Sequence, residues 1–204
     1  MTPEQSKQEM NKQESIAIEM EGYTSDSRIQ FLNYEELDPR TNMKEAAIFY
    51  TALNEKRNAY VGSMNTFSKL ISNFPSELEE PAISILRRCN DSLEVIDEIR
   101  TNLRERLETL QDIYQKLIGT WHCSNMADVT YTYRADFTYD YKNHQSGEEQ
   151  KSYFSLQYNT DSPSKYEIQR AGSTAYWFEF KSNDDLMLRL GEGDNAMWFA
   201  FTRQ

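Results

Sequence analysis

Few residues in this chain could do chemistry, and the first to consider are its two histidines and two cysteines. His122 and Cys123 are adjacent, and together with His144 they are candidate metal or haem ligands, while Cys89 stands apart. Histidine and cysteine are common metal ligands. Adjacent residues on a strand point to opposite faces of a sheet, however, so His122 and Cys123 are poorly placed to bind one ion. The sequence therefore predicts no metal site and no cofactor.

Pairs of adjacent acidic residues are the next candidates. Acid–base catalysis needs carboxylates that converge in a cleft, whereas adjacent side chains on a helix or strand diverge. We therefore interpret these pairs as solvated surface charge or turn residues. They are Glu35-Glu36, Glu79-Glu80, Glu148-Glu149 and Asp184-Asp185.

Nucleotide-binding and nucleophile motifs are equally weak. Gly191-x-Gly193 lacks the third glycine and the following helix of a dinucleotide-binding fingerprint. The chain contains no Gly-x-Ser-x-Gly sequence, and its histidines belong to no recognisable Ser/His or Cys/His arrangement. We therefore predict no catalytic residues and expect that the protein is not an enzyme.

Composition excludes further classes. The chain has 204 residues, with 22 Lys plus Arg against 33 Asp plus Glu and a formal net charge of −11. Such acidity argues against nucleic-acid binding, which depends on cationic neutralisation of phosphates. No stretch approaches the roughly 20 apolar residues of a membrane span, and the first thirty residues do not resemble an export signal. We expect a cytoplasmic protein.

The elements that position these residues fall into two parts that meet at Gly119. Seventeen of the 26 aromatic residues, including all three tryptophans, lie after Gly119 in the sequence. Both parts are acidic, so the difference concerns fold and not the charge of a partner. We expect an α+β protein with a polar segment over residues 1–37, a helical hairpin over 38–118 and a β domain over 119–204.

The hairpin is predicted from two long heptad patterns typical of a coiled coil. The start is signalled by Asp38-Pro39, and Phe74-Pro75-Ser76 breaks the pattern, which gives helices over about 39–73 and 77–118. Arg57 is a polar interruption of the first pattern, and the spacing of the second slips between Ile96 and Leu107. The first pattern contains Ala46, Tyr50, Leu53, Arg57, Tyr60, Met64, Phe67, Ile71 and Phe74; the second contains Leu86, Cys89, Leu93, Ile96, Ile99, Leu103, Leu107, Leu110, Tyr114 and Leu117.

Two helices leave much of each apolar stripe exposed to water. The stripe therefore needs a third helix, the β domain or a second copy of the chain. Residues 1–22 are either that third helix or a partly disordered tail. Cys89 lies on the stripe, where a buried free thiol is expected, and a bridge to Cys123 would require the helix to fold back on the β domain.

The β part is predicted from strict alternation. Apolar residues take the odd positions from Val129 to Tyr141, which indicates two strands joined by a turn near Ala135-Asp136. Further strands are expected at residues 119–124, 150–159, 164–170, 174–181, 184–190 and 195–203. About eight short antiparallel strands fit an up-and-down meander, closed or half-closed into a small barrel.

Motifs of this part share one resemblance. It opens with Leu117-Ile-Gly-Thr-Trp121, continues with Tyr131-Thr-Tyr-Arg-Ala-Asp-Phe-Thr-Tyr139 and ends with residues 177–190 and 197–203. In this order they resemble the Gly-x-Trp start, the strand–turn–strand and the closing hairpins of small bacterial lipocalin-like (calycin) domains. The resemblance covers residues 117–204. Phe137 stands where such turns usually carry glycine, and the domain is little more than half the size of a full lipocalin.

The resemblance also implies a structural plug. Trp121 would pack across the closed bottom of the barrel, and Arg203 would lie over its ring in a cation–π contact worth about 1 kcal/mol. Neither residue would be catalytic.

The candidate ligand- or partner-binding residues are aromatic. Most rings of the β part are expected in the core, but Trp177 and Trp198 fall out of phase with their apolar neighbours and are expected to point outward. An outward tryptophan needs a partner. Tyr133 and Tyr141 complete the set of candidates.

Two functions from different classes are compatible with these features. The first is a non-enzymatic interaction or assembly protein, in which the hairpin mediates oligomerisation or partner binding and the lipocalin-like domain presents a binding surface. An acidic inhibitor or immunity-type protein that blocks a basic enzyme is a narrower version of it. The alternative is a binder of small hydrophobic ligands that uses the barrel interior, as the resemblance implies for fuller lipocalins.

Overall fold

The computed structural model describes residues 1–123, 128–159, 161–171, 175–190 and 196–204. Residues 124, 174, 191–193 and 195, which are predicted to lie in strand ends or in a loop, are outside these ranges. The chain forms two compact units. One contains Met1–Glu35 and Lys44–Arg106, and the other contains Glu36–Met43 and Leu107–Gln204.

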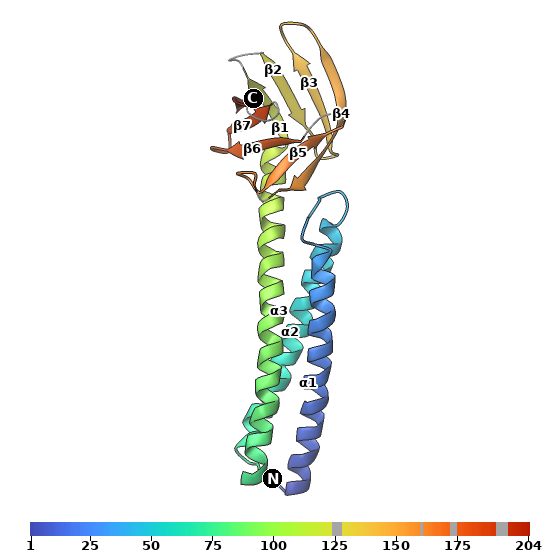
Figure 1. Cartoon of the computed structure of the whole chain (residues 1–204), viewed down its shortest axis with the longest axis vertical. Helices are drawn as coiled ribbons and strands as arrows, with labels where there is room; N and C mark the ends of the chain where they lie inside the picture. The colour runs from blue at the N-terminus through green and yellow to red at the C-terminus, as the bar shows by residue number, and fades with distance from the viewer. Residues whose placement is uncertain (124–127, 160, 172–174, 191–195) are drawn as a thin grey trace. The chain divides into compact units, whose positions relative to one another are not determined.

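The described residues contain three helices: α1 (Pro3–Leu32), α2 (Met43–Ile71) and α3 (Ser76–Leu117). In the first unit the three run side by side (Figure 1). Of the alternatives left open for residues 1–22, a third helix and a partly disordered tail, the helix is therefore the one present. Its start is a capping box, in which the Thr2 hydroxyl accepts from the Gln5 N–H and the Gln5 side chain accepts from the Thr2 N–H.

The buried face of α1 explains why its sequence predicts a helix so weakly. It is made of Ala17 and Met20 together with small or polar residues, and the helix shows little amphipathic contrast. A helix that packs with such a face gives almost no apolar periodicity. The buried polar residues are Ser6, Gln13, Thr24 and Ser27.

The stripe of α3 is buried as predicted at Cys89, Ile96, Ile99, Leu103, Leu110 and Leu117, and it is shifted by one residue at three other positions. Ala82, Ile85, Ser92 and Ile113 are buried, while Leu86, Leu93, Leu107 and Tyr114 are only half-buried. On α2, similarly, Phe49 is buried in place of Tyr50. The buried residues follow a regular 3–4 spacing from Ala82 to Leu103, with the small residues Ala82 and Ser92 in core positions, whereas none of residues 104–109 is buried. The pattern is therefore interrupted after Leu103, within the stretch where a slip is predicted.

The predicted start of α2, residue 39, is wrong, because the helix begins at Met43. The Asp38 carbonyl oxygen accepts from the N–H groups of Thr41, Asn42 and Met43, and its carboxylate accepts from the Arg40 N–H at 2.7 Å. These bonds form a compact turn, so Asp38 and Pro39 precede the helix by one turn of chain. The break between α2 and α3 lies where the sequence predicts it, and α3 runs through Pro81 in its second turn.

The second unit contains a closed antiparallel barrel in the strand order β1 to β8. Each strand pairs with the next, and β8 closes on β1 through Trp121 opposite Arg203 and His122 opposite Thr202. The predicted α+β class and antiparallel meander are confirmed, in the closed form. The strands are β1 (Gly119–Cys123), β2 (Val129–Tyr133), β3 (Thr138–Asn143), β4 (Glu149–Tyr158), β5 (Tyr166–Arg170), β6 (Tyr176–Phe180), β7 (Asp185–Leu190) and β8 (Met197–Arg203).

Large side chains fill the inward positions of the barrel. Along β2 and β5 every second residue is buried, as expected for strands with one face in a core. The inward set is mostly aromatic, which accounts for the concentration of rings after Gly119. It contains Trp121, Tyr131, Tyr133, Tyr139, Phe154, Leu156, Tyr166, Ile168, Arg170, Phe178, Leu186, Leu188 and Phe201.

The state of the two cysteines and the apolar character of the helices complete the description of the fold. Cys89 and Cys123 are both buried free thiols. None of the helices in the described ranges combines the length and the apolar character that a membrane span requires.

Candidate functional site

The predicted plug residues are in contact. Trp121 is fully buried, and the guanidinium carbon of Arg203 lies 4.4 Å from the centroid of its ring. The indole N–H donates to the Leu117 carbonyl oxygen at 2.9 Å. Arg203 also donates to the carbonyl oxygens of Lys116 and Ile118. The arrangement joins the last turn of α3 to β1 and β8, and it is structural.

A row of outward side chains crosses three strands of the barrel wall. Trp177 on β6 is in register with Arg189 on β7, which is in register with Trp198 on β8. Arg189 stacks over Trp177, with its guanidinium carbon 4.6 Å from the ring centroid. Trp177 is half-buried beneath it, whereas Trp198 is 40% exposed and its neighbour Met197 is 52% exposed. Both tryptophans therefore point outward.

The two candidate tyrosines lie on the inner side. Tyr133 is 1% exposed, and its hydroxyl has no hydrogen-bond partner among the described residues. It is therefore inaccessible to a partner protein. Tyr141 is half-buried and its ring centroid lies 5.3 Å from that of Tyr131.

A buried arginine is the one charged side chain among the described inward residues. Arg170 is 6% exposed, and its guanidinium carbon lies 3.9 Å from the Tyr176 ring centroid and 4.5 Å from that of Tyr131. Burial raises the pKa of Tyr131 and Tyr133, while the charge of Arg170 opposes this rise. The cation is thus held among neutral phenol rings.

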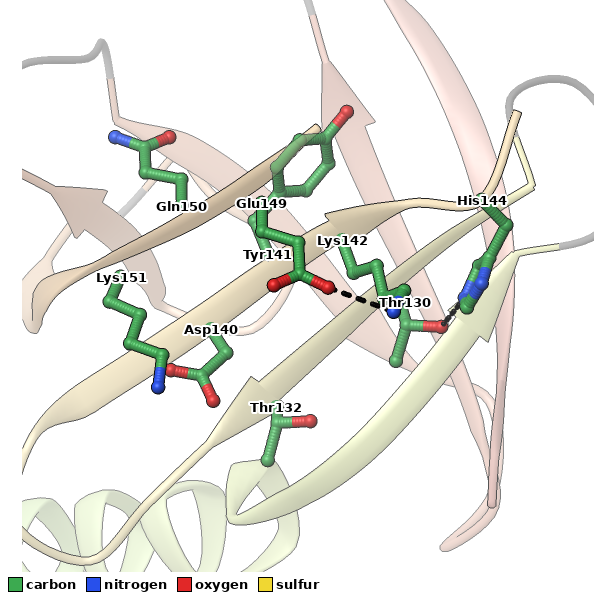
Figure 2. Close-up of a pocket in the computed structure, with 9 residues that line it drawn as sticks. All are labelled: Thr130, Thr132, Asp140, Tyr141, Lys142, His144, Glu149, Gln150 and Lys151. Atoms are coloured by element: carbon green, nitrogen blue, oxygen red, sulfur yellow. Dashed lines mark hydrogen bonds and ion pairs between the residues drawn. The ribbon is translucent and has the colours of Figure 1, made fainter. Parts of the chain in front are cut away.

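A polar hollow of about 260 Å³ lies on the outer face of β2, β3 and β4 (Figure 2). Thr130, Lys142 and Glu149 are in register across the three strands, and Lys142 pairs with Glu149 at 2.8 Å. The next row contains Thr132, Asp140 and Lys151. His144 completes the lining on this face, and Tyr141 and Gln150, whose side chains lie on the opposite face of β3 and β4, border it.

Both histidines of the chain meet at the end of this face. The Nε2 atom of His122 lies 2.7 Å from Asp128 Oδ1, and the Nε2 atom of His144 lies 2.8 Å from the hydroxyl of Thr130. The two imidazole ring centroids are 5.8 Å apart. One potential ligand atom from each of His122, Asp128 and His144 lies within 4.8 Å of the others. These are donor types that a metal ion uses.

The grouping of these three residues is not predicted from the sequence, where His122 and His144 are considered as ligands only together with Cys123, and Asp128 is not among the candidates. Cys123 does point the other way, into the barrel, where it is 1% exposed. The partners of His122 come from the adjacent hairpin, which the alternation around Thr130 could have revealed once strand pairing was assumed.

Comparison with family models, with curated proteins and with solved structures finds no match to this chain. Its function is therefore inferred from the side chains that the two faces of the barrel present.

Proposed function

We propose that this protein is a non-enzymatic protein-binding protein whose barrel presents the binding surface. The observation that carries the proposal is the outward row of Trp177, Arg189 and Trp198, with Trp198 exposed at its end. Tryptophan and arginine are the residues most enriched at the energetic centres of interfaces. We call these three residues the tryptophan row.

The partner is a different protein with a basic surface around an apolar pocket. The chain carries a formal net charge of −11, and Glu167 lies directly opposite Trp177 in the β5–β6 register. A second copy docked on the tryptophan row would bring two strongly acidic chains together, whereas a basic partner would be attracted. An inhibitor or immunity-type protein that blocks a basic enzyme is one form of this function.

Self-association through the helices has less support from the structure than from the sequence. It was expected because a pair of helices alone would leave their apolar stripes exposed to water. Helix α1 supplies the missing surface, with Ala17 and Met20 fully buried. We therefore place partner binding on the barrel.

The lipocalin-like alternative, a small hydrophobic ligand inside the barrel, has weaker support. The inward positions hold large rings such as Trp121, Tyr133 and Phe178, each no more than 1% exposed. A ligand would have to displace them.

Site-specific photocrosslinking in cells that express the protein tests the proposal. A benzoylphenylalanine photocrosslinker placed at Trp198 should yield one predominant adduct with a protein whose contact surface is basic. The same photocrosslinker at Tyr153, an outward aromatic on β4 that is 59% exposed, is the matched control and should not yield it.

The affinity of the purified partner for variants of the protein then distinguishes specific from non-specific binding. Trp198→Ala should weaken binding by about 30-fold or more, as expected for an interface hot spot. Glu167→Lys and added salt should also weaken it, whereas Glu148→Lys, an equal charge change elsewhere on the barrel, should not. Adducts only with a second copy of the chain, or identical adducts from positions 198 and 153, would refute the proposal.

A further inference from the structure

The two histidines and Asp128 lie on one face because of strand register. His122 is opposite Thr130, so both point outward from the barrel. Asp128 comes directly before β2, and its Oδ1 atom lies 2.7 Å from the Nε2 atom of His122. His144 follows the last register pair of β2 and β3, Val129 with Asn143, and its N–H donates to the Asp128 carbonyl oxygen at 2.9 Å. The side chains of His122, Asp128 and His144, which come from three separate segments, therefore lie close together.

We propose that His122, Asp128 and His144 form a binding site for a divalent first-row transition-metal ion, with Zn²⁺ as its representative. Bond lengths of about 2.0–2.2 Å around a tetrahedral zinc ion place its ligand atoms about 3.3–3.6 Å apart. The three ligand atoms already lie within 4.8 Å of one another. Small side-chain movements therefore suffice to reach coordination distances.

A hydrogen-bonded aspartate–histidine pair alone would account for His122 and Asp128 but not for His144. The chain has only two histidines, and their rings lie 5.8 Å apart with the carboxylate beside them. Two imidazoles and one carboxylate suit Zn²⁺, Co²⁺ and Ni²⁺, whereas Mg²⁺ and Ca²⁺ prefer oxygen ligands. The donor set therefore selects a class of metal.

The surroundings hold the ligands in place and leave an approach open. Asp128 has a left-handed backbone with φ of 46°, and the Thr130 hydroxyl contacts the His144 ring. The side chain of His122 is 26% exposed and that of Asp128 is 41% exposed, so an ion can enter from solvent. Three protein ligands leave a coordination position for water or for a donor atom of a second molecule. His144 also lines the polar hollow, which borders that position.

A bound ion would link β1 to the β2–β3 hairpin at this end of the barrel. Because the ion would bind the folded chain and not the unfolded chain, Zn²⁺ should raise the thermal stability of the protein. This consequence is separate from partner binding through the tryptophan row.

Zinc titration of the tag-free full-length protein tests the site. We expect one Zn²⁺ per chain at pH 7.5 by isothermal titration calorimetry, a higher Tm with Zn²⁺, and no comparable effect of Mg²⁺. Because the chain has two histidines, its NMR spectrum contains two imidazole C–H pairs, and both should shift with the same Zn²⁺ dependence. This measurement needs no variant.

Substitutions then assign the ligands. His122→Gln, His144→Gln and Asp128→Asn should each weaken Zn²⁺ binding at least tenfold, while Glu148→Gln, an exposed acidic neighbour, should leave it unchanged. Far-UV circular dichroism checks that each variant folds. A double Cys89→Ala, Cys123→Ala variant should bind like the wild type. The proposal fails if the imidazole signals do not respond to Zn²⁺, or if binding follows the cysteines instead of the histidines.

Discussion

Arg203 lies across the indole ring of Trp121, with 4.4 Å between its guanidinium carbon and the ring centroid. The same guanidinium donates to backbone carbonyl oxygens at the end of α3 and at Asn183. One side chain therefore covers the buried tryptophan and ties together the first strand, the last strand and the helix that leads into the barrel.

Arg203→Ala should lower the free energy of unfolding of the barrel by about 3 kcal/mol, because a cation–π contact and charged hydrogen bonds are lost together. Urea unfolding followed by near-ultraviolet circular dichroism in the tryptophan bands measures this, because all three tryptophans lie in the barrel. Arg189→Ala is the matched control: it removes the cation above Trp177 on the outer surface and should cost about 1 kcal/mol or less. Equal losses of unfolding free energy in the two variants would mean that the contact of Arg203 with Trp121 stabilises the barrel no more than the surface contact of Arg189 with Trp177.

Gly119→Ala should destabilise the barrel by about 2 kcal/mol. Gly119 has φ of 142°, and a Cβ atom there would lie 2.7 Å from Arg203 Nη1. The cost should be smaller in the Arg203→Ala background, because the steric part is absent while the backbone strain remains. Gly22→Ala in α1, where a Cβ atom meets nothing within 4 Å, should instead stabilise the helical unit by about 1 kcal/mol. Strict additivity of Gly119→Ala and Arg203→Ala would argue against the close contact.

The outline of the barrel was predictable because its alternation is nearly perfect. Apolar and polar residues alternate in the sequence from Val129 to Tyr141, and β2 and β3, which residues 134–137 separate, use this alternation to face a packed interior. The polar inner face of α1 hid the third helix, since Ser6, Gln13 and Thr24 are buried without an apolar signal. The proximity of Asp128 to His122 depends on the pairing of β1 with β2, so the alternation along either strand alone does not show it.

Arg57, which interrupts the apolar pattern of α2, is explained by a partner on another helix. Its guanidinium donates to both carboxylate oxygens of Asp97 on α3, at 2.5 and 3.0 Å. Arg100 donates to the same carboxylate at 3.1 Å. A pairwise contact between distant residues is invisible to periodicity, so the sequence marked the position as an exception without giving its reason.

The hydrogen bond from Arg57 holds the pKa of Asp97 below its ordinary value. A carboxyl group whose pKa is lowered by folding stabilises the protein above the unfolded pKa of about 3.9, and this stabilisation is lost as the pH falls through the folded pKa. Asp97→Asn should therefore cost about 1 kcal/mol at pH 7, after allowance for solvent screening, and the difference from wild type should shrink below about pH 4.

Urea unfolding at a series of pH values, followed at 222 nm, measures this difference for the helical unit. Glu80→Gln, which removes an ion pair with Arg87 whose two side chains are 73% and 66% exposed, is the control and should show no such pH dependence. A difference between Asp97→Asn and wild type that stays constant down to pH 2 would contradict the assignment.

Phe137 lies in the turn between β2 and β3, and its φ of 63° is the left-handed value that glycine adopts freely. Its ring stacks on Tyr114 with centroids 5.1 Å apart and lies 5.7 Å from Phe154. Phe137→Gly should relieve about 1 kcal/mol of backbone strain but lose about 3 kcal/mol of packing, for a net loss of about 2 kcal/mol. Lys165→Gly is the control, because Lys165 has φ of 64° with an exposed side chain and should gain about 1 kcal/mol. Near-ultraviolet circular dichroism during urea unfolding measures both, and a stabilising Phe137→Gly would show that the ring does not offset the strain of its backbone.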